Sequence, residues 1–278
     1  MALVTLNEIL PEARKQKRAV AAFNVANYEC ALAVIRAAEA EKLPVIVQIF
    51  QRLFRSEKGA DLAGTLLRLA HRCSQPVVVH LDHGAEAWQI RDALSAGLTS
   101  VMLDGSKLPY DENVALTSYA ASYAHRVGAS CEGEIGHVAM GDENAITTVE
   151  DAVRFYNDTK VDALAVSVGT VHGFYKSAPH IEVQRCRDIA DALGGVPLVL
   201  HGGSGIPDDQ VKAAINAGIR KMNIGTDVCC AFADGTLESL NDPNRSLAVD
   251  MFMKKPIESV KKLALSKIAL TGAGGKAR

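Results

Sequence analysis

The feature that most constrains the fold is an alternation, along nearly the whole chain, of short runs rich in β-branched residues with longer segments of helical periodicity. This order is typical of a parallel sheet, because parallel strands must be joined by crossover connections. The predicted strands cover residues 19–25, 44–50, 76–83, 99–104, 128–135, 161–169, 197–202 and 220–225. The predicted helices between them cover residues 28–41, 61–73, 86–96, 112–126, 149–159, 181–193 and 208–217.

Eight strands with covering helices predict an α/β fold of the (β/α)8 TIM-barrel class, with an extra C-terminal helical segment from Leu247 to about Leu270. The length of 278 residues suits one barrel and no linker divides the chain, so residues 1–278 are expected to form one domain. An open doubly wound sheet also accommodates eight strands. The barrel is preferred because no GxGxxG motif follows the first strand, where a dinucleotide fold has one.

The composition argues against several classes of function. Hydrophobic residues make up 48% of the chain and no apolar run is long enough to cross a bilayer, so we expect no membrane partner. A net charge of −2 without a basic block argues against nucleic acid as a partner. The N-terminus lacks a secretory-signal pattern and the six cysteines form no CxxC pair, which together predict a cytoplasmic protein with reduced thiols.

Residue types that bind metals or substrates recur at the carboxyl ends of the predicted strands. They are Asn24, Asp82, His83, Asp104, Glu134, His172, His201, Asn223 and Thr226. In a parallel barrel these ends meet at one mouth, where barrel enzymes place their active sites. The repetition predicts a functional site rather than scattered structural polar groups.

Three of these residues are histidines, His83, His172 and His201. Three imidazoles that leave one coordination position open form a catalytic zinc site, so we predict that they bind Zn2+. The alternative is that they are unrelated capping or core residues.

Three carboxylates accompany these histidines. Asp82, beside His83, is predicted to donate or accept a proton, or else to orient a metal ligand. Asp104 and Glu134 offer oxygen ligands for a second cation, divalent or monovalent, unless they only form hydrogen bonds at the mouth.

The loops after the seventh and eighth predicted strands contain HGGSG from His201 and NIGT from Asn223. Their small residues leave backbone N–H groups open to an anion, and barrels usually hold phosphate at these two loops. We therefore predict a phosphate site to which Ser204, Asn223 and Thr226 add hydrogen bonds and Lys176 adds a charge. The alternative is that the glycines only permit tight turns.

In this order, the motifs resemble the class II, metal-dependent ketose-bisphosphate aldolases, which include fructose- and tagatose-bisphosphate aldolases. The matching segments are AFNV at 22–25, HLDHG at 80–84, SVMLDGS at 100–106, EGEIG at 132–136, GTVHGFY at 169–175, PLVLHGGSGIPDDQ at 197–210, GIRKMNIGTD at 218–227 and GGKA at 274–277. They span nearly the entire chain. The resemblance implies reversible cleavage of a phosphorylated ketose to dihydroxyacetone phosphate and an aldehyde, through a zinc-stabilised enediolate.

The resemblance also implies a role for each matching residue. It implies that His83, His172 and His201 bind the zinc and that Asp82 is the acid/base at the aldehyde-derived oxygen. Asp104 and Glu134 match a second metal site, and Asn24 matches a substrate-contacting asparagine. The positions that match the surroundings of the phosphate are Gly173, Lys176, Gly202, Ser204, Asn223 and Thr226.

The sequence departs from the family pattern in two places. The loop after EGEIG is short and lacks a doubled glycine, so Glu143, with Asp142 as its alternative, is the predicted base that removes the carbon-bound proton. Residues 48–51 begin and end with glutamine where the family has small polar residues, and Gly225 occupies the centre of NIGT. These changes leave the acceptor aldehyde open.

Two rival functions remain. A Schiff-base aldolase would use a lysine such as Lys221 or Lys176 as its nucleophile, but it gives the three histidines no task. A non-catalytic sugar-phosphate binder would retain the barrel and lose turnover through the short loop.

A homo-oligomer, dimer or tetramer, is expected. The C-terminal helical segment from Leu247 either forms its interface or packs on its own barrel.

Overall fold

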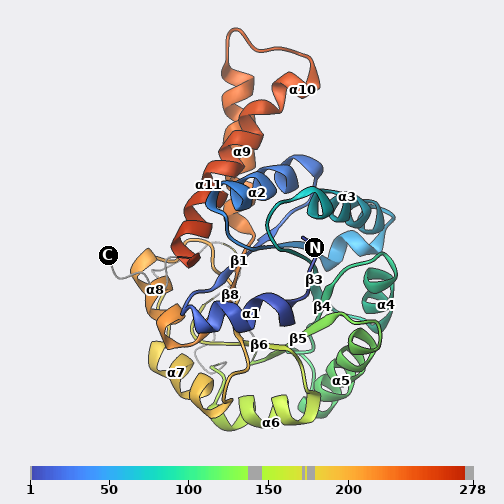
Figure 1. Ribbon diagram of the computed structural model, residues 1–278, viewed down its shortest axis with the longest axis vertical. Coiled ribbons are helices and arrows are strands. Elements are labelled where there is room, and N and C mark those ends of the chain that lie inside the picture. The colour runs from blue at the N-terminus through green and yellow to red at the C-terminus, as the bar shows by residue number, and fades with distance from the viewer. Residues whose placement is uncertain (1, 137–145, 171–172, 174–178, 273–278) are drawn as a thin grey trace.

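A computed structural model describes residues 2–136, 146–170, 173 and 179–272, which form a closed barrel of parallel strands in the order β1 to β8 (Figure 1). The strands are β1 (Val20–Asn24), β2 (Val45–Phe50), β3 (Val77–Gly84), β4 (Ser100–Leu103), β5 (Ser130–Ile135), β6 (Ala163–Val166), β7 (Leu198–Leu200) and β8 (Ile219–Ile224). Each lies inside or within one residue of a predicted run, and the predicted (β/α)8 fold class is confirmed.

Helices cover the outside of the barrel and follow the predicted segments. They are α2 (Tyr28–Glu41), α3 (Lys58–Arg72), α4 (Ala87–Ser95), α5 (Tyr110–Arg126), α6 (Val149–Thr159), α7 (Val183–Ala192) and α8 (Asp208–Ala217). The sequence missed the first turn of α3 and the short helix η1 (Gln51–Arg55) before it, because both are too polar to display an apolar period.

The floor of the barrel is closed by α1 (Leu6–Lys15), which Figure 1 shows lying across its amino-terminal end. Its apolar face is buried against inward-pointing residues of the strands. The cluster consists of Leu6, Ile9, Leu10, Ala13, Val20, Ala22, Ile46, Val78, Ala163, Ala165 and Val199. The lower half of the barrel interior is therefore a packed apolar core with no open channel.

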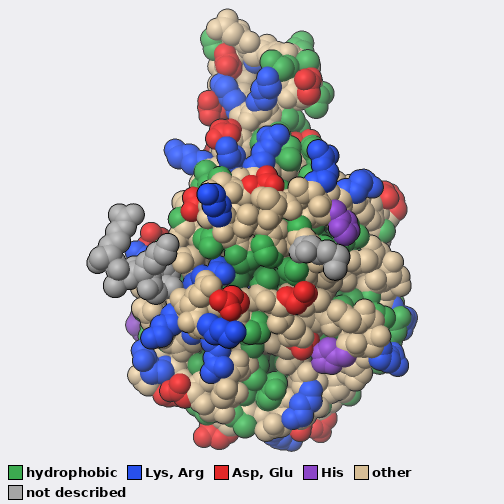
Figure 2. All heavy atoms as spheres, viewed as in Figure 1, with side chains coloured by type: hydrophobic (Ala, Val, Ile, Leu, Met, Phe, Trp, Pro, Cys, Tyr) green, Lys and Arg blue, Asp and Glu red, His purple; other side chains and the backbone are tan. Residues whose placement is uncertain are grey.

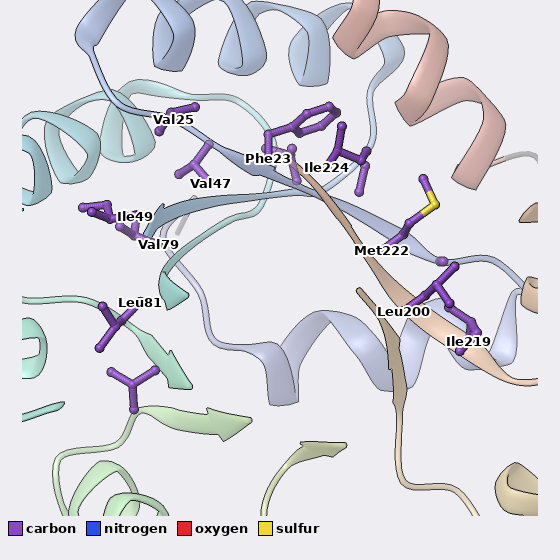
Figure 3. Packing of buried hydrophobic residues seen from close by; sticks show 14 of the residues in the cluster. Phe23, Val25, Val47, Ile49, Val79, Leu81, Leu200, Ile219, Met222 and Ile224 are labelled. Atoms are coloured by element: carbon purple, nitrogen blue, oxygen red, sulfur yellow. The ribbon is translucent and has the colours of Figure 1, made fainter. Parts of the chain in front are cut away.

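A second apolar layer lies between the strands and the helices. Figure 3 shows side chains such as Phe23, Val47 and Val79 pointing from the strands towards this layer. Because side chains alternate along a strand, the residues between them point into the barrel. Near the carboxyl ends these inward residues are polar, and they are Asn24, Gln48, His80, Asp82, Glu132, Glu134, Lys221 and Asn223.

A helical arm, residues 226–272, leaves the barrel after β8. It consists of α9 (Thr226–Asn241), α10 (Val249–Phe252) and α11 (Lys254–Gly272), and Figure 1 shows α9 and α11 side by side with α10 at the far end. The predicted helical run from Leu247 is interrupted because Pro256 has no N–H with which to continue a helix from α10. Figure 2 shows charged side chains of both signs on this projection.

None of the helices in the described ranges combines the length and the apolar character needed to cross a bilayer.

The described cysteines are all unpaired, four of them buried. Burial raises the pKa of the Cys30 thiol to about 12 and that of Cys186 to about 12, so these thiols pack as small apolar groups.

The α1 floor gives the first prediction. Leu10 is fully buried between α1 and the strands, so Leu10→Ala should lower the free energy of unfolding by about 2–5 kcal/mol. Val127→Ala is the control, because Val127 is 58% exposed and its truncation should change that energy by less than about 0.5 kcal/mol. Chemical denaturation measures both, and equal effects would contradict a floor role for α1.

Candidate active site

The carboxyl ends of the strands bring most of the predicted site residues together at one mouth. Asp82, Glu134, His201 and Asn223 are buried, and His83 and Asp104 are partly buried beside them. Four predicted residues lie outside the described part of the chain, and they are Asp142, Glu143, His172 and Lys176. The described site therefore contains two of the three predicted zinc ligands, together with Asp82, Asp104 and Glu134.

A local irregularity of β3 turns two adjacent side chains towards the mouth. In a regular strand Asp82 and His83 would point to opposite faces. The pairing of β3 with β4 shifts between Leu81 and Gly84, and His83 adopts a left-handed conformation with φ of 55°. Few non-glycine residues adopt this conformation, and its cost is characteristic of functional sites. It brings the His83 imidazole to the same side as the Asp82 carboxylate, with Nε2 3.9 Å from Asp82 Oδ1.

His83 and His201 face each other across the mouth, with ring centroids 4.7 Å apart and planes at 78°. His83 Nδ1 lies 2.8 Å from Asp104 Oδ2, and His201 Nε2 lies 2.8 Å from Glu132 Oε1. In each ring one nitrogen is therefore at hydrogen-bond distance from a carboxylate, and the other also faces one: His83 Nε2 lies 3.9 Å from Asp82 Oδ1 and His201 Nδ1 lies 3.4 Å from Glu134 Oε2. This is how metal-binding imidazoles are usually held.

Two overlapping groups of side chains have the spacing of a metal site. Asp82, His83 and His201 offer ligand atoms that lie within 4.8 Å of one another, and so do His83, Asp104 and Glu134. Because His83 belongs to both groups, the two positions are neighbours. The donor set of imidazole nitrogens and carboxylate oxygens fits a divalent cation such as Zn2+.

The electrostatics of the mouth favour a cation. Burial lowers the pKa of His83, but the nearby Asp82, Asp104 and Glu134 carboxylates outweigh burial and raise it to about 10. Burial raises the pKa of Asp104, but its hydrogen bond and charge interaction with His83 outweigh burial and hold that pKa well below its ordinary value. Three carboxylates around one imidazole concentrate negative charge, and the same field attracts a divalent ion.

Asp82 is held by two amides. Asn24 Nδ2 donates to Asp82 Oδ2 at 2.6 Å, and Asn223 Nδ2 donates to Asp82 Oδ1 at 3.1 Å. The side chain of Gln48, which is fully buried, in turn donates to Asn24 Oδ1 at 2.9 Å. Asn223, which was predicted at the phosphate, therefore also contacts the acid/base candidate. Gln51, the other glutamine of residues 48–51, accepts from Gln89 Nε2 of α4 at 2.8 Å.

The two glycine-rich loops lie against each other at the start of α9. Gly203 N donates to Asn223 O at 2.9 Å, and Ser204 Oγ accepts from Asp227 N at 3.1 Å in the first turn of α9. Gly202 has a φ of 67°, which only glycine adopts easily. Thr226 begins a helix of 16 residues, whose amino-terminal end attracts anions. The arrangement suits a phosphate. Gly173 is exposed and has a φ of 89°.

Sequence reasoning missed a layer of buried charge below the mouth. Glu132, Lys221 and His80 are all fully buried, and Lys221 Nζ lies 2.8 Å from Glu132 Oε2. His80 Nδ1 pairs with Ser100 Oγ at 2.8 Å, and burial, followed by the charge of Lys221, lowers the pKa of this imidazole well below 6.5. The alternation of side chains along a strand could have predicted this layer. Glu132, Lys221 and His80 lie two positions before Glu134, Asn223 and Asp82, respectively, and therefore point to the same face of the sheet.

A family model described as fructose-bisphosphate aldolase class-II matches residues 4–276. The chain belongs to the class II fructose-bisphosphate aldolase family. The resemblance predicted from the motifs is thus confirmed, and the protein is an aldolase, an enzyme that cleaves carbon–carbon bonds. Members of the class II aldolase family act on phosphorylated sugars and are generally metal-dependent.

Relatives of this class II aldolase match along its full length. A 6-phospho-5-dehydro-2-deoxy-D-gluconate aldolase of Bacillus subtilis (strain 168) is 35% identical over 286 residues, covering 100% of this chain and 98% of that protein. A fructose-bisphosphate aldolase of Geobacillus stearothermophilus is 35% identical over 292 residues, covering 100% and 99%. The crystal structure of the YdjI aldolase from Escherichia coli K12 has a TM-score of 0.89 and 34% identity, covering 99% and 100%.

The β3 irregularity gives the second prediction. A Cβ at Gly84 would lie 2.6 Å from Met102 O, so Gly84→Ala should displace the backbone beside His83 and lower the unfolding free energy by about 1–3 kcal/mol. Gly64→Ala is the matched control. Its Cβ would meet only Arg68 at 4.0 Å in the middle of α3, so it should be neutral or stabilise by up to about 1 kcal/mol. Equal stability of the two variants would contradict the close approach at Gly84.

Proposed function

We propose that this class II aldolase is zinc-dependent and reversibly cleaves a phosphorylated ketose to dihydroxyacetone phosphate and an aldehyde. The observation that carries the proposal is the convergence of Asp82, His83 and His201, whose ligand atoms lie within 4.8 Å of one another. His172, outside the described residues, is the proposed third imidazole ligand. When bound, a divalent ion supplies a Lewis acid that polarises the ketone oxygen.

The residues at the mouth divide the remaining work. Asp82 is proposed to take the hydroxyl proton during cleavage and to return it during condensation. Its two amide partners, Asn24 and Asn223, fix the direction in which its oxygens point. Glu143, or Asp142 in its place, is the proposed base for the carbon-bound proton, and both lie outside the described residues.

The proposed phosphate site consists of the two glycine-rich loops that meet at the start of α9. Gly202, Ser204 and Thr226 line them, and the helix amino terminus adds its positive end. Gly173 and Lys176 are proposed to complete it from the loop after β6, and Lys176 lies outside the described residues. Holding the phosphate there keeps the reacting carbons next to His83 and Asp82.

Asp104 and Glu134 are proposed to hold a second cation, or the same ion in another position. Each lies on one side of His83, with Asp104 Oδ2 2.8 Å and Glu134 Oε2 3.9 Å from Nδ1. Because the two positions share an imidazole, occupation of one alters the ligands left for the other. The metal is therefore proposed to occupy either of two neighbouring positions, one beside Asp82 and His201 and the other beside Asp104 and Glu134.

The contacts of Lys221 weigh against the Schiff-base rival. Its ammonium is fully buried, with Glu132 Oε2 at 2.8 Å and Asn223 Oδ1 at 2.7 Å. A nucleophilic lysine needs a free amine facing the substrate. Lys221 instead lies below the mouth, engaged with two acceptors.

The acceptor aldehyde is a question for experiment. The two relatives named above are each 35% identical to this chain and carry different substrate names, so overall identity does not choose between them. A panel of phosphorylated, carboxylated and neutral aldehydes with dihydroxyacetone phosphate and Zn2+, read by product formation, identifies the acceptor.

Metal removal gives the third prediction. EDTA should abolish cleavage, Zn2+ should restore it, and borohydride should trap no substrate on the protein. His201→Ala should lose stoichiometric zinc with an unchanged circular dichroism spectrum. His125→Ala should keep it, because that side chain is 41% exposed on α5 and bonds to Asp162. Full activity in EDTA together with borohydride trapping would establish the rival mechanism.

Asp82 gives the fourth prediction. Asp82→Ala should retain exchange of the dihydroxyacetone phosphate α-proton in deuterated buffer and slow condensation by about 10²–10⁴-fold. Alanine is preferred to asparagine, whose NH2 group would face the amide donors of Asn24 or Asn223. Asp61→Ala, at an exposed position of α3, is the control. Loss of exchange in Asp82→Ala would assign the carbon proton to Asp82 itself.

The predicted homo-oligomer remains a proposal, and the helical arm supports it. Large apolar side chains are exposed on the arm, and they are Leu237, Leu240, Leu247, Val249 and Met251. We expect light scattering to give a dimer or a tetramer, and Val249→Lys, at a position that is 69% exposed, to shift the protein towards smaller species. A monomer at micromolar concentration would contradict an interface on the arm.

A further inference from the structure

Lys221 lies inside the barrel one layer below the mouth, and its side chain is fully buried. Lysine is rarely buried completely, because removing an ammonium from water is costly unless acceptors replace the water. The backbone of Lys221 pairs with Val20 and Val199, which belong to the apolar floor. The acceptors that compensate its charge therefore lie above it, towards the mouth.

The first acceptor leads to a proposed metal ligand. Lys221 Nζ lies 2.8 Å from Glu132 Oε2, and the other oxygen of this carboxylate, Oε1, lies 2.8 Å from His201 Nε2. All three side chains are fully buried, so water screens neither contact.

The second acceptor leads to the acid/base candidate. Lys221 Nζ donates to Asn223 Oδ1 at 2.7 Å, and Asn223 Nδ2 donates to Asp82 Oδ1 at 3.1 Å. The Lys221 ammonium is thus connected to His201 through Glu132 and to Asp82 through Asn223, with one intervening side chain in each case.

The chemistry of the ammonium sets the polarity of both branches. An ammonium only donates hydrogen bonds, so the Asn223 side chain must turn its oxygen towards Lys221 and its NH2 group towards Asp82. An ionised carboxylate only accepts, so the hydrogen between Glu132 and His201 must be on His201 Nε2. His201 Nδ1, which lies 3.4 Å from Glu134 Oε2, is then the nitrogen left for a metal.

We propose that Lys221 is a positioning residue that fixes, through Glu132, the tautomer of His201 and, through Asn223, the orientation of Asp82. The inference rests on the proposed function, because it assumes that His201 binds a divalent cation. It predicts coordination through His201 Nδ1. It also explains why a barrel interior holds a lysine that the reaction itself does not need.

The test removes the buried ion pair as a unit. The double variant Lys221→Met/Glu132→Gln removes both charges of the pair, so the barrel should fold. Lys221→Met alone would leave the buried Glu132 carboxylate without its ammonium partner. In the double variant the amide that replaces the Glu132 carboxylate can donate or accept, and nothing sets the polarity of Asn223. The matched control is Lys255→Met/Asp242→Asn, which removes a 2.9 Å ion pair from the helical arm.

The readout is Co2+ titration of the full chain, followed by the visible absorption of the bound ion. The double variant should bind Co2+ about 10- to 100-fold more weakly than the wild type, with an altered absorption spectrum, and the control should match the wild type. A folded double variant with wild-type affinity and spectrum would overturn the inference and leave the proposed function intact. A wild-type protein that binds neither Co2+ nor Zn2+ would overturn both.

A second measurement is made on the wild-type protein, so it does not depend on the folding of a variant that lacks the Lys221–Glu132 pair. Long-range 1H–15N spectra of the Zn2+-loaded wild type, with 15N-labelled histidine, report which ring nitrogen of His201 carries the proton. His201→Ala identifies its signals by their loss. Protonated Nε2 supports the inference, and protonated Nδ1 contradicts it.

Discussion

The mouth of this barrel depends on one backbone departure, the left-handed conformation of His83 at the end of β3. Alternation along a strand allows only every second side chain to face the barrel axis. Because His83 departs from that alternation, a carboxylate and an imidazole from consecutive positions lie within 3.9 Å of each other at the mouth. The nearby rings and carboxylates, His201, Asp104 and Glu134, are arranged around the imidazole that this turn delivers.

The interior of the barrel changes character along its axis. The half closed by α1 is apolar and supports stability, and the half towards the mouth holds charged groups that face one another at hydrogen-bond distance. The boundary lies at Lys221, whose neighbours across the sheet, Val20 and Val199, belong to the floor. A charge layer of this kind is stable only if every member is paired, so the site tolerates changes of whole pairs better than changes of single residues.

Much of the fold could be predicted from the sequence, because β-branched runs and helical periods are local signals. The polar ends of the strands also predicted which side chains meet, since a closed parallel barrel brings all those ends together. The conformation of His83 left no local trace apart from the glycine that follows it. The bond from Asn223 to Asp82 could not be predicted for a different reason: the two residues are 141 positions apart, and only the closed barrel brings the amide and the carboxylate together.

Helix α9 connects two distant parts of the molecule, the mouth of the barrel and the projecting arm. Its first residue, Thr226, follows the short glycine-containing turn after β8, and its last, Asn241, lies on the projecting arm. Its sixteen residues make a helix about 24 Å long. The proposed interface on the arm and the proposed phosphate site therefore lie at opposite ends of one helix, so a change in α9 is common to both.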